Sequence, residues 1–179
     1  MNLPNILTIS RIVIIPVMAG LLMYDSLVAA LIAGVLFIIA TITDWLDGHI
    51  ARKYELVSDL GALLDPLADK LLIITALVML IPLGRVPAWV VAIIVGRELA
   101  ITGLRAIAAE KSIIIPAGWL GKYKTSFQCA ALIPLILHFE VWGINFQLAG
   151  EFFLWIALFF TVWSGWDYIY DYVKQTELA

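Results

Sequence analysis

The chain has 179 residues, of which 63% are hydrophobic and 14% are charged, against about 25% charged in a typical soluble domain. The mean hydropathy of +1.01 excludes an ordinary soluble globular protein. It indicates an integral membrane protein, and we expect one domain over residues 1–179. The net charge of −3 excludes no class of protein, whereas the single cysteine excludes an intramolecular disulfide.

Six apolar stretches follow one another along the chain. Each is long enough, as a helix, to cross a hydrocarbon core of about 30 Å, and turn-forming residues such as those at 82–84 and 115–118 separate them. The predicted spans are residues 5–23, 27–51, 59–81, 87–109, 119–139 and 146–173. We therefore expect an all-α integral membrane protein with six transmembrane helices in one bundle.

Lysine and arginine residues are distributed unevenly between the two ends of this expected bundle. Six spans place both termini on one side, and all of the 11 basic residues except Arg85 belong to that side. By the positive-inside rule both termini are cytoplasmic. We expect a multi-pass protein of the inner (cytoplasmic) membrane with its polar site facing the cytoplasm.

The first span carries three polar residues, Asn5, Thr8 and Arg11, in an apolar segment. Asn5 follows a proline, where helix capping is a sufficient explanation. Arg11 fits either an anchor that fixes topology or a contact to a phosphate, and the sequence leaves both readings open.

Four aspartates occupy the next two spans. Asp44 and Asp47 are three residues apart and Asp65 and Asp69 are four apart, so each pair lies on one helical face. The connection between the spans is short, which favours antiparallel neighbours with converging acidic faces. A carboxylate near the bilayer centre costs at least about 2.5 kcal/mol, so a cation must gather these four.

One or two hard divalent cations, Mg²⁺ or Mn²⁺, suit four carboxylates, because both ions prefer oxygen ligands. No Cys or His accompanies the acids, which argues against a zinc-type site. Gly48 and Gly61 lie beside them on the same two helices. Either they permit close helix packing, or they clear space for a ligand against the backbone.

Basic residues gather in the fourth and fifth spans, at Arg97, Arg105, Lys122 and Lys124. Arg97 has a structural alternative in a pair with Glu98 or with an aspartate, and the others are also explained as anchors at the membrane interface. Together they predict a basic pocket beside the metal site, suited to the phosphate group of an acceptor.

The acidic stretch resembles the signature of the CDP-alcohol phosphatidyltransferase family, with every signature position filled. In this chain the signature reads Asp44-x₂-Asp47-Gly48-x₂-Ala51-Arg52-x₈-Gly61-x₃-Asp65-x₃-Asp69. The resemblance implies transfer of a phosphatidyl group from CDP-diacylglycerol to an alcohol, with release of CMP. It also implies a homodimer and substrates that include membrane lipid, with no nucleic acid as a partner.

The resemblance also implies roles for individual residues. Asp44, Asp47, Asp65 and Asp69 would hold the metal, with Asp69 also acting as the catalytic base. The CDP-diacylglycerol site would be formed by Asn5, Thr8, Gly48, Arg52, Ser58 and Gly61.

The segments GRELAITGLR and GWLGKYKTS look like the branch of this family whose acceptor is glycerol 3-phosphate, and Asn5-x₂-Thr8-x₂-Arg11 resembles it too. Alternative acceptors are inositol phosphate, serine, or phosphatidylglycerol as in cardiolipin synthesis. A cation transporter and a non-catalytic scaffold are rival classes. The basic cluster argues against the transporter, because it requires an anion, and a scaffold leaves the buried charges unexplained.

Overall fold

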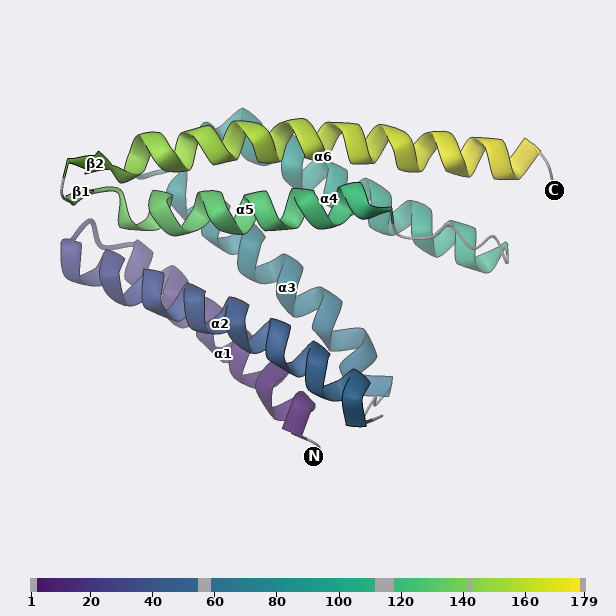
Figure 1. Ribbon diagram of the computed structural model, residues 1–179, viewed down its shortest axis with the longest axis horizontal. Coiled ribbons are helices and arrows are strands. Elements are labelled where there is room, and N and C mark those ends of the chain that lie inside the picture. The colour runs from purple at the N-terminus through teal and green to yellow at the C-terminus, as the bar shows by residue number, and fades with distance from the viewer. Residues whose placement is uncertain (1–2, 55–58, 112–117, 142, 178–179) are drawn as a thin grey trace.

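The computed structural model describes residues 3–54, 59–111, 118–141 and 143–177. Within these ranges the chain forms six α-helices and one short antiparallel hairpin (Figure 1). The prediction of six helices is confirmed, and each observed helix begins and ends within a few residues of its expected bounds. The elements are α1 (Leu3–Leu22), α2 (Leu27–Tyr54), α3 (Asp59–Leu80), α4 (Ala88–Glu110), α5 (Trp119–Leu137), β1 (Glu140–Val141), β2 (Ile144–Asn145) and α6 (Phe146–Glu177).

Proline, glycine and one left-handed residue mark the helix ends. Pro87 precedes α4 and Gly118 precedes α5, both with extended backbone. Gly84 turns the chain between α3 and α4 at a φ of 68°, which an L side chain rarely adopts. His138 ends α5 at a φ of 47°, the left-handed conformation that commonly terminates helices.

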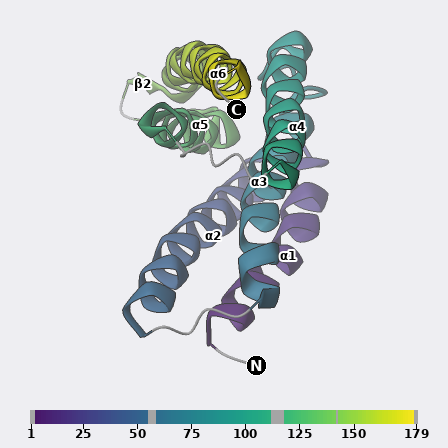
Figure 2. The same cartoon turned by 90° about the vertical axis from the view of Figure 1, so that its right-hand side faces the viewer.

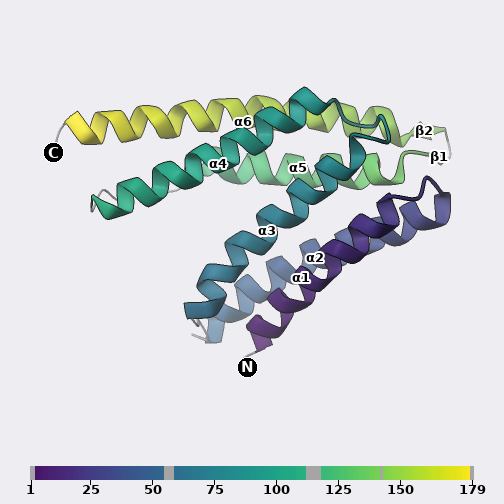
Figure 3. The same cartoon turned by 180° about the vertical axis from the view of Figure 1, so that it is seen from behind.

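The helices converge at one end of the molecule and spread apart toward the other. α5 and α6 lie side by side along the long axis, α4 packs on α6, and α1, α2 and α3 form a second group inclined to them (Figures 1 and 3). We call the end that carries β1 and β2 the narrow end. The opposite end, where α1 begins and α6 ends, is the wide end. Figure 2 shows the two groups separating.

The apolar core fills the narrow half. Its fully buried side chains come from the end of α1, the start of α2, the end of α3, the start of α4, the end of α5 and the start of α6. Among them are Met18, Phe37, Leu77, Ile94, Leu135 and Leu154. Most of the buried polar side chains lie instead in the wide half, including Thr8, Arg11, Glu98, Lys124 and Gln128. Packing and polarity are therefore separated along the helix axes.

One basic residue joins several elements at the narrow end. Arg85, in the turn between α3 and α4, is buried and pairs with Asp25 at 2.8 Å. It also donates to the carbonyl of Ile136 at 3.0 Å, and it lies 3.2 Å from His138 Nε2. The solitary basic residue on this side is thus satisfied by local contacts, and His138 has a structural role.

Two of the described helical stretches, residues 27–44 and 146–176, are long and apolar enough to cross a membrane. Large apolar side chains are exposed along α1, α2 and α6, among them Val17, Val35 and Trp163. α3 and α4 carry charged residues inside their apolar stretches, among them Asp69, Lys70 and Glu98. Several of the charged residues that line the site therefore lie within the helices rather than in the loops.

Candidate functional site

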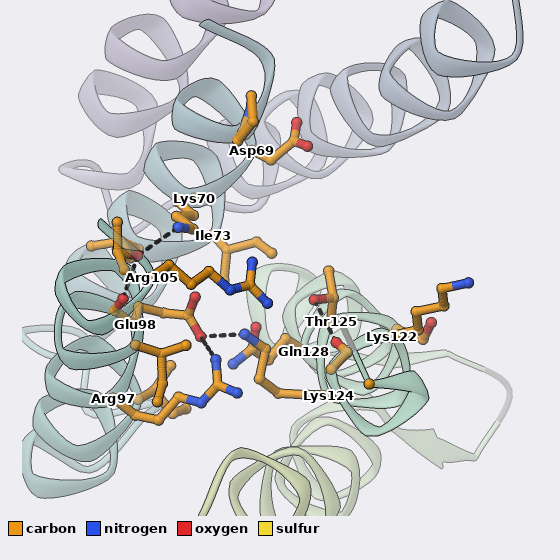
Figure 4. Close-up of a pocket in the computed structure, with 18 of the residues that line it drawn as sticks. Asp69, Lys70, Ile73, Arg97, Glu98, Arg105, Lys122, Lys124, Thr125 and Gln128 are labelled. Carbon is orange, nitrogen blue, oxygen red and sulfur yellow. Dashed lines mark hydrogen bonds and ion pairs between the residues drawn. The ribbon is translucent and has the colours of Figure 1, made fainter. Parts of the chain in front are cut away.

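A cavity of about 590 Å³ opens between α2, α3, α4 and α5 in the wide half of the molecule (Figure 4). This volume falls in the range of about 300–1,000 Å³ that is usual for small-molecule sites. The polar residues that line it are Asp44, Asp69, Lys70, Arg97, Glu98, Thr102, Arg105, Lys122, Lys124, Thr125, Ser126 and Gln128. Acidic and basic residues predicted from separate segments therefore share one cavity.

Two of the predicted metal-binding carboxylates contact the same arginine side chain. The Arg11 guanidinium is fully buried, and its Nη1 atom lies 2.6 Å from Asp69 Oδ1 and 3.1 Å from Asp44 Oδ1. Because both acids contact the same nitrogen atom, the acidic faces of α2 and α3 meet there. For Arg11 the observed contacts are to carboxylates.

α1 forms a further wall of the acidic site. Thr8 lies one turn before Arg11 on the same face, is buried, and donates its hydroxyl hydrogen to Asp65 Oδ1. Among the described residues, α1 packs against both α2 and α3. Through Thr8 and Arg11 it contacts acids of both helices.

The described acids have the donor chemistry that a hard divalent cation prefers, because Asp44, Asp65 and Asp69 carry carboxylate oxygens. In this structure the Arg11 guanidinium lies against two of them. Among the side chains that the structure describes, no three His, Cys, Asp or Glu residues form a metal cluster on their own. The side chain of the fourth predicted ligand, Asp47, lies outside that described part.

The basic wall of the cavity is organised around one glutamate. Glu98 of α4 accepts hydrogen bonds from Lys124 Nζ of α5 and from Arg97 Nη1 of its own helix, the latter at 3.2 Å (Figure 4). Arg97 Nη2 donates to Ser164 Oγ of α6 at 2.9 Å. The predicted alternative of an Arg97–Glu98 pair is confirmed, while Arg97 still lines the cavity.

The other predicted acceptor residues are placed differently. Arg105 extends from α4 into the cavity (Figure 4), with its guanidinium carbon 5.1 Å from the centre of the Tyr168 ring. Lys122 lines the rim, is exposed, and points away from Glu98 (Figure 4). Lys70 lies opposite on α3 and donates to Thr102 Oγ1 at 2.7 Å.

Several predicted donor-site residues lie outside what the structure describes. Ser58 falls between the described ranges. The side chains of Asn5 and Arg52, and the surroundings of Gly48 and Gly61, are likewise outside the described part, although their backbones belong to α1, α2 and α3.

Sequence reasoning missed three features of the site. It left Arg11 without a partner, it treated Glu98 only as a partner for Arg97, and it assigned nothing to α6, which supplies Ser164 and Tyr168. Polar residues embedded in apolar helices were the available signal for the first two. Ser164 and Tyr168 carry no such signal, because both are common in membrane helices.

The fold and the site thus define an all-helical protein in which carboxylates and basic side chains line one cavity. The family model of the CDP-alcohol phosphatidyltransferases matches residues 1–163. The chain belongs to this family.

Curated relatives resemble almost the whole chain. A protein of Bacillus subtilis named CDP-diacylglycerol–glycerol-3-phosphate 3-phosphatidyltransferase is 44% identical over 93% of this chain and 93% of its own length. A protein of Rickettsia typhi with the same name is 42% identical over 93% of this chain and 94% of its own. A probable phosphatidylglycerophosphate synthase of Mycobacterium tuberculosis is 39% identical over 94% of this chain and 80% of its own.

Proposed function

We propose that the protein transfers the phosphatidyl group of CDP-diacylglycerol to glycerol 3-phosphate, forming phosphatidylglycerophosphate and CMP. The observation that carries this proposal is the shared cavity, in which Asp44 and Asp69 face Arg97, Arg105 and Lys124. A metal-binding acidic wall suits the pyrophosphate of the donor, and a basic wall suits an acceptor that is itself a phosphate ester. The names of the relatives from Bacillus and Rickettsia agree with this assignment.

Asp44, Asp47, Asp65 and Asp69 would hold one or two divalent cations, Mg²⁺ or Mn²⁺. When bound, the cation polarises the phosphoryl oxygens and offsets the charge of the leaving CMP. Arg11, fixed between Asp44 and Asp69, keeps these carboxylates close together. Thr8 orients Asp65 in the same way from α1.

Asp69 is the group that we assign as general base. It lies where the acidic wall opens into the cavity, so an acceptor hydroxyl can come within hydrogen-bond reach of it. The hydroxyl oxygen attacks the phosphorus of the phosphatidyl group, its proton passes to the Asp69 carboxylate, and the bond from phosphorus to the CMP oxygen breaks. The donor nucleotide is assigned to Asn5, Thr8, Gly48, Arg52, Ser58 and Gly61 by the family signature.

The basic wall selects the acceptor in this proposal. Arg97, Arg105 and Lys124 offer charged N–H donors to a phosphate monoester, with Lys122 at the entrance. Serine has no phosphate to engage these residues, and phosphatidylglycerol offers only a shielded phosphodiester. Inositol phosphate shares the phosphate and is the closest competitor.

We also propose the setting of the reaction. All six helices cross the inner membrane, both termini are cytoplasmic, and the wide end with its cavity opens toward the cytoplasm. The distribution of basic residues supports this orientation, because among the Lys and Arg side chains that the structure describes, Arg85 alone lies at the narrow end. Two copies are proposed to form a homodimer, by analogy with the family.

The test is CMP release by the purified protein with CDP-diacylglycerol, Mg²⁺ and a panel of acceptors. We expect the fastest release with glycerol 3-phosphate, slower release with inositol phosphate, and little with serine or phosphatidylglycerol. Faster turnover of another acceptor would refute the acceptor assignment. Absence of release with every acceptor, together with metal flux across liposomes, would refute the enzyme assignment in favour of a transporter.

A further inference from the structure

A carboxylate lies in the wall that the proposed function assigns to an anion, where direct contact with phosphate would be repulsive. Glu98 is 9% exposed, and its Oε1 atom accepts hydrogen bonds from Lys124 and Arg97 (Figure 4). Its side chain therefore contacts the cations of the pocket. Any effect of Glu98 on an anion in the pocket must therefore act through Lys124 and Arg97.

Helix packing alone does not explain a charge at this position. Ile94, Glu98 and Ile101 follow one another on one face of α4, and all three are buried. An apolar residue at 98 would continue that stripe, whereas the observed residue buries an ionic group together with Lys124 and Arg97. Buried ionic groups pay a desolvation penalty that well-packed apolar residues avoid. The charges at this position thus require a reason other than stability.

α6 fixes Arg97 from the side opposite to Glu98. Arg97 Nη2 donates to Ser164 Oγ at 2.9 Å. A methyl group at Gly165 would come within 3.2 Å of Arg97 Cγ, so the absence of a side chain there makes room for the arginine stem. Glu98 and α6 together leave the Arg97 guanidinium little freedom to rotate.

Lys124 keeps N–H donors for a ligand after it has bonded to Glu98. An ammonium group has three N–H donors, and among the described residues Lys124 has one hydrogen-bond partner, Glu98. Donors therefore remain for a ligand in the cavity that Lys124 lines. Arg105 differs, because it has no contact with Glu98 and rests on the ring of Tyr168.

We propose that Glu98 is the positioning residue of the acceptor site. It holds Lys124 and Arg97 in the orientation in which a phosphate monoester meets N–H donors already in place. Fixing these long side chains before binding removes an ordering cost that the ligand would otherwise bear. This inference rests on the proposed function and adds a residue to its specificity.

Two roles of Glu98, positioning of its partners and simple charge compensation, predict opposite changes in acceptor binding for the Glu98→Gln variant. Losing the carboxylate makes the cavity more positive, so charge compensation alone predicts tighter binding of the acceptor. Positioning predicts weaker binding, because Lys124 and Arg97 lose their common partner. We expect the KM for glycerol 3-phosphate to rise about tenfold, with the KM for CDP-diacylglycerol and kcat little changed. An unchanged or lower KM for glycerol 3-phosphate overturns the proposal.

A double-mutant cycle tests whether Glu98 acts through Lys124. We expect Lys124→Gln to raise the same KM, and Glu98→Gln to add little in the Lys124→Gln background. Additive effects of the two substitutions overturn the assignment. Glu110→Gln is the matched control, because it removes the same charge from the exposed last turn of α4. Its KM values should equal those of the unsubstituted protein.

Direct binding separates this inference from the proposed reaction. Calorimetry with glycerol 3-phosphate and with inorganic phosphate requires no turnover, and we expect about tenfold weaker binding of both to Glu98→Gln. Glu98→Asp, which keeps the charge on a shorter side chain, should weaken binding in the same direction and serves if the first variant does not fold. Binding by the unsubstituted protein without CMP release refutes only the proposed reaction. Absence of any phosphate binding refutes the positioning role as well.

Discussion

The Asp69 carboxylate belongs both to the acidic wall and to the lining of the cavity. It contacts the buried Arg11 guanidinium at 2.6 Å, and it also lines the cavity that Arg97 and Lys124 enter from the other side. A carboxylate at the boundary between the acidic wall and the cavity is suited to proton transfer in the proposed reaction, because the acceptor hydroxyl would meet the donor beside it.

We predict that Asp69→Asn lowers the rate of CMP release by at least about 10²-fold, since an amide cannot accept the proton. The measurement is the initial rate at saturating CDP-diacylglycerol and glycerol 3-phosphate over a range of Mg²⁺ concentrations. We expect the loss to persist at high Mg²⁺. Recovery of the rate at high Mg²⁺ would assign Asp69 to metal binding alone.

Asp25→Asn is the control for that substitution. Asp25 is exposed and pairs with Arg85 at the narrow end, far along the helices from the cavity. The same chemical change there should leave the rate of CMP release unaltered. A comparable loss in Asp25→Asn would show that the assay reports stability of the bundle.

The sequence predicts which site residues share a face of one helix, but it does not predict contacts between helices. The spacing of Asp44 and Asp69 with their partners placed each pair on one helical face, and both acids line the cavity. The contacts of Arg11 with Asp44 and Asp69, and the contact of Glu98 with Lys124, were not predictable, because they join different helices. Spacing along one helix carries no information about which neighbour it faces.

α5 and α6 approach each other closely at Gly150. A methyl group at Gly150 of α6 would lie 2.5 Å from Leu135 Cγ and 3.0 Å from the Leu135 backbone nitrogen. We predict that Gly150→Ala destabilises the protein by about 1–3 kcal/mol, because α6 must move away from α5. The measurement is the thermal unfolding midpoint in detergent, which should fall.

Gly20→Ala provides the matched comparison for Gly150→Ala. A methyl group at Gly20 in α1 would meet no heavy atom within 4 Å in the described part of the chain. Alanine also favours the helix over glycine by about 1 kcal/mol, so the unfolding midpoint should stay the same or rise. Equal destabilisation by the two substitutions would contradict the assigned close contact.

At the scale of elements the sequence was most informative. Long apolar runs separated by Pro, Gly and polar residues predicted all six helices, with ends that differ from the observed ones by at most four residues. It did not predict that α1 packs against both α2 and α3. Their apolar surfaces are similar all round, so hydrophobic periodicity does not select a partner for each helix.

For the whole molecule, the distribution of Lys and Arg between the two ends determines the expected orientation. We predict that an impermeant maleimide labels Glu140→Cys, in β1, from outside intact cells, and that it labels Lys174→Cys, near the end of α6, only after permeabilisation. Both substitutions are made in a Cys129→Ala background, which removes the only natural thiol. Labelling of Lys174→Cys in intact cells would reverse the proposed topology.

The packed narrow half has an electrical consequence. Met18, Phe37, Leu77, Ile94 and Leu135 pack tightly on that side of the cavity. In the proposed topology the transmembrane potential would fall mainly across this apolar layer, and the charges that move during transfer would stay at the cytoplasmic potential. Moving one charge through the full field would involve about 2.3 kcal/mol per 100 mV. We therefore expect the rate of the proposed reaction to be independent of the transmembrane potential.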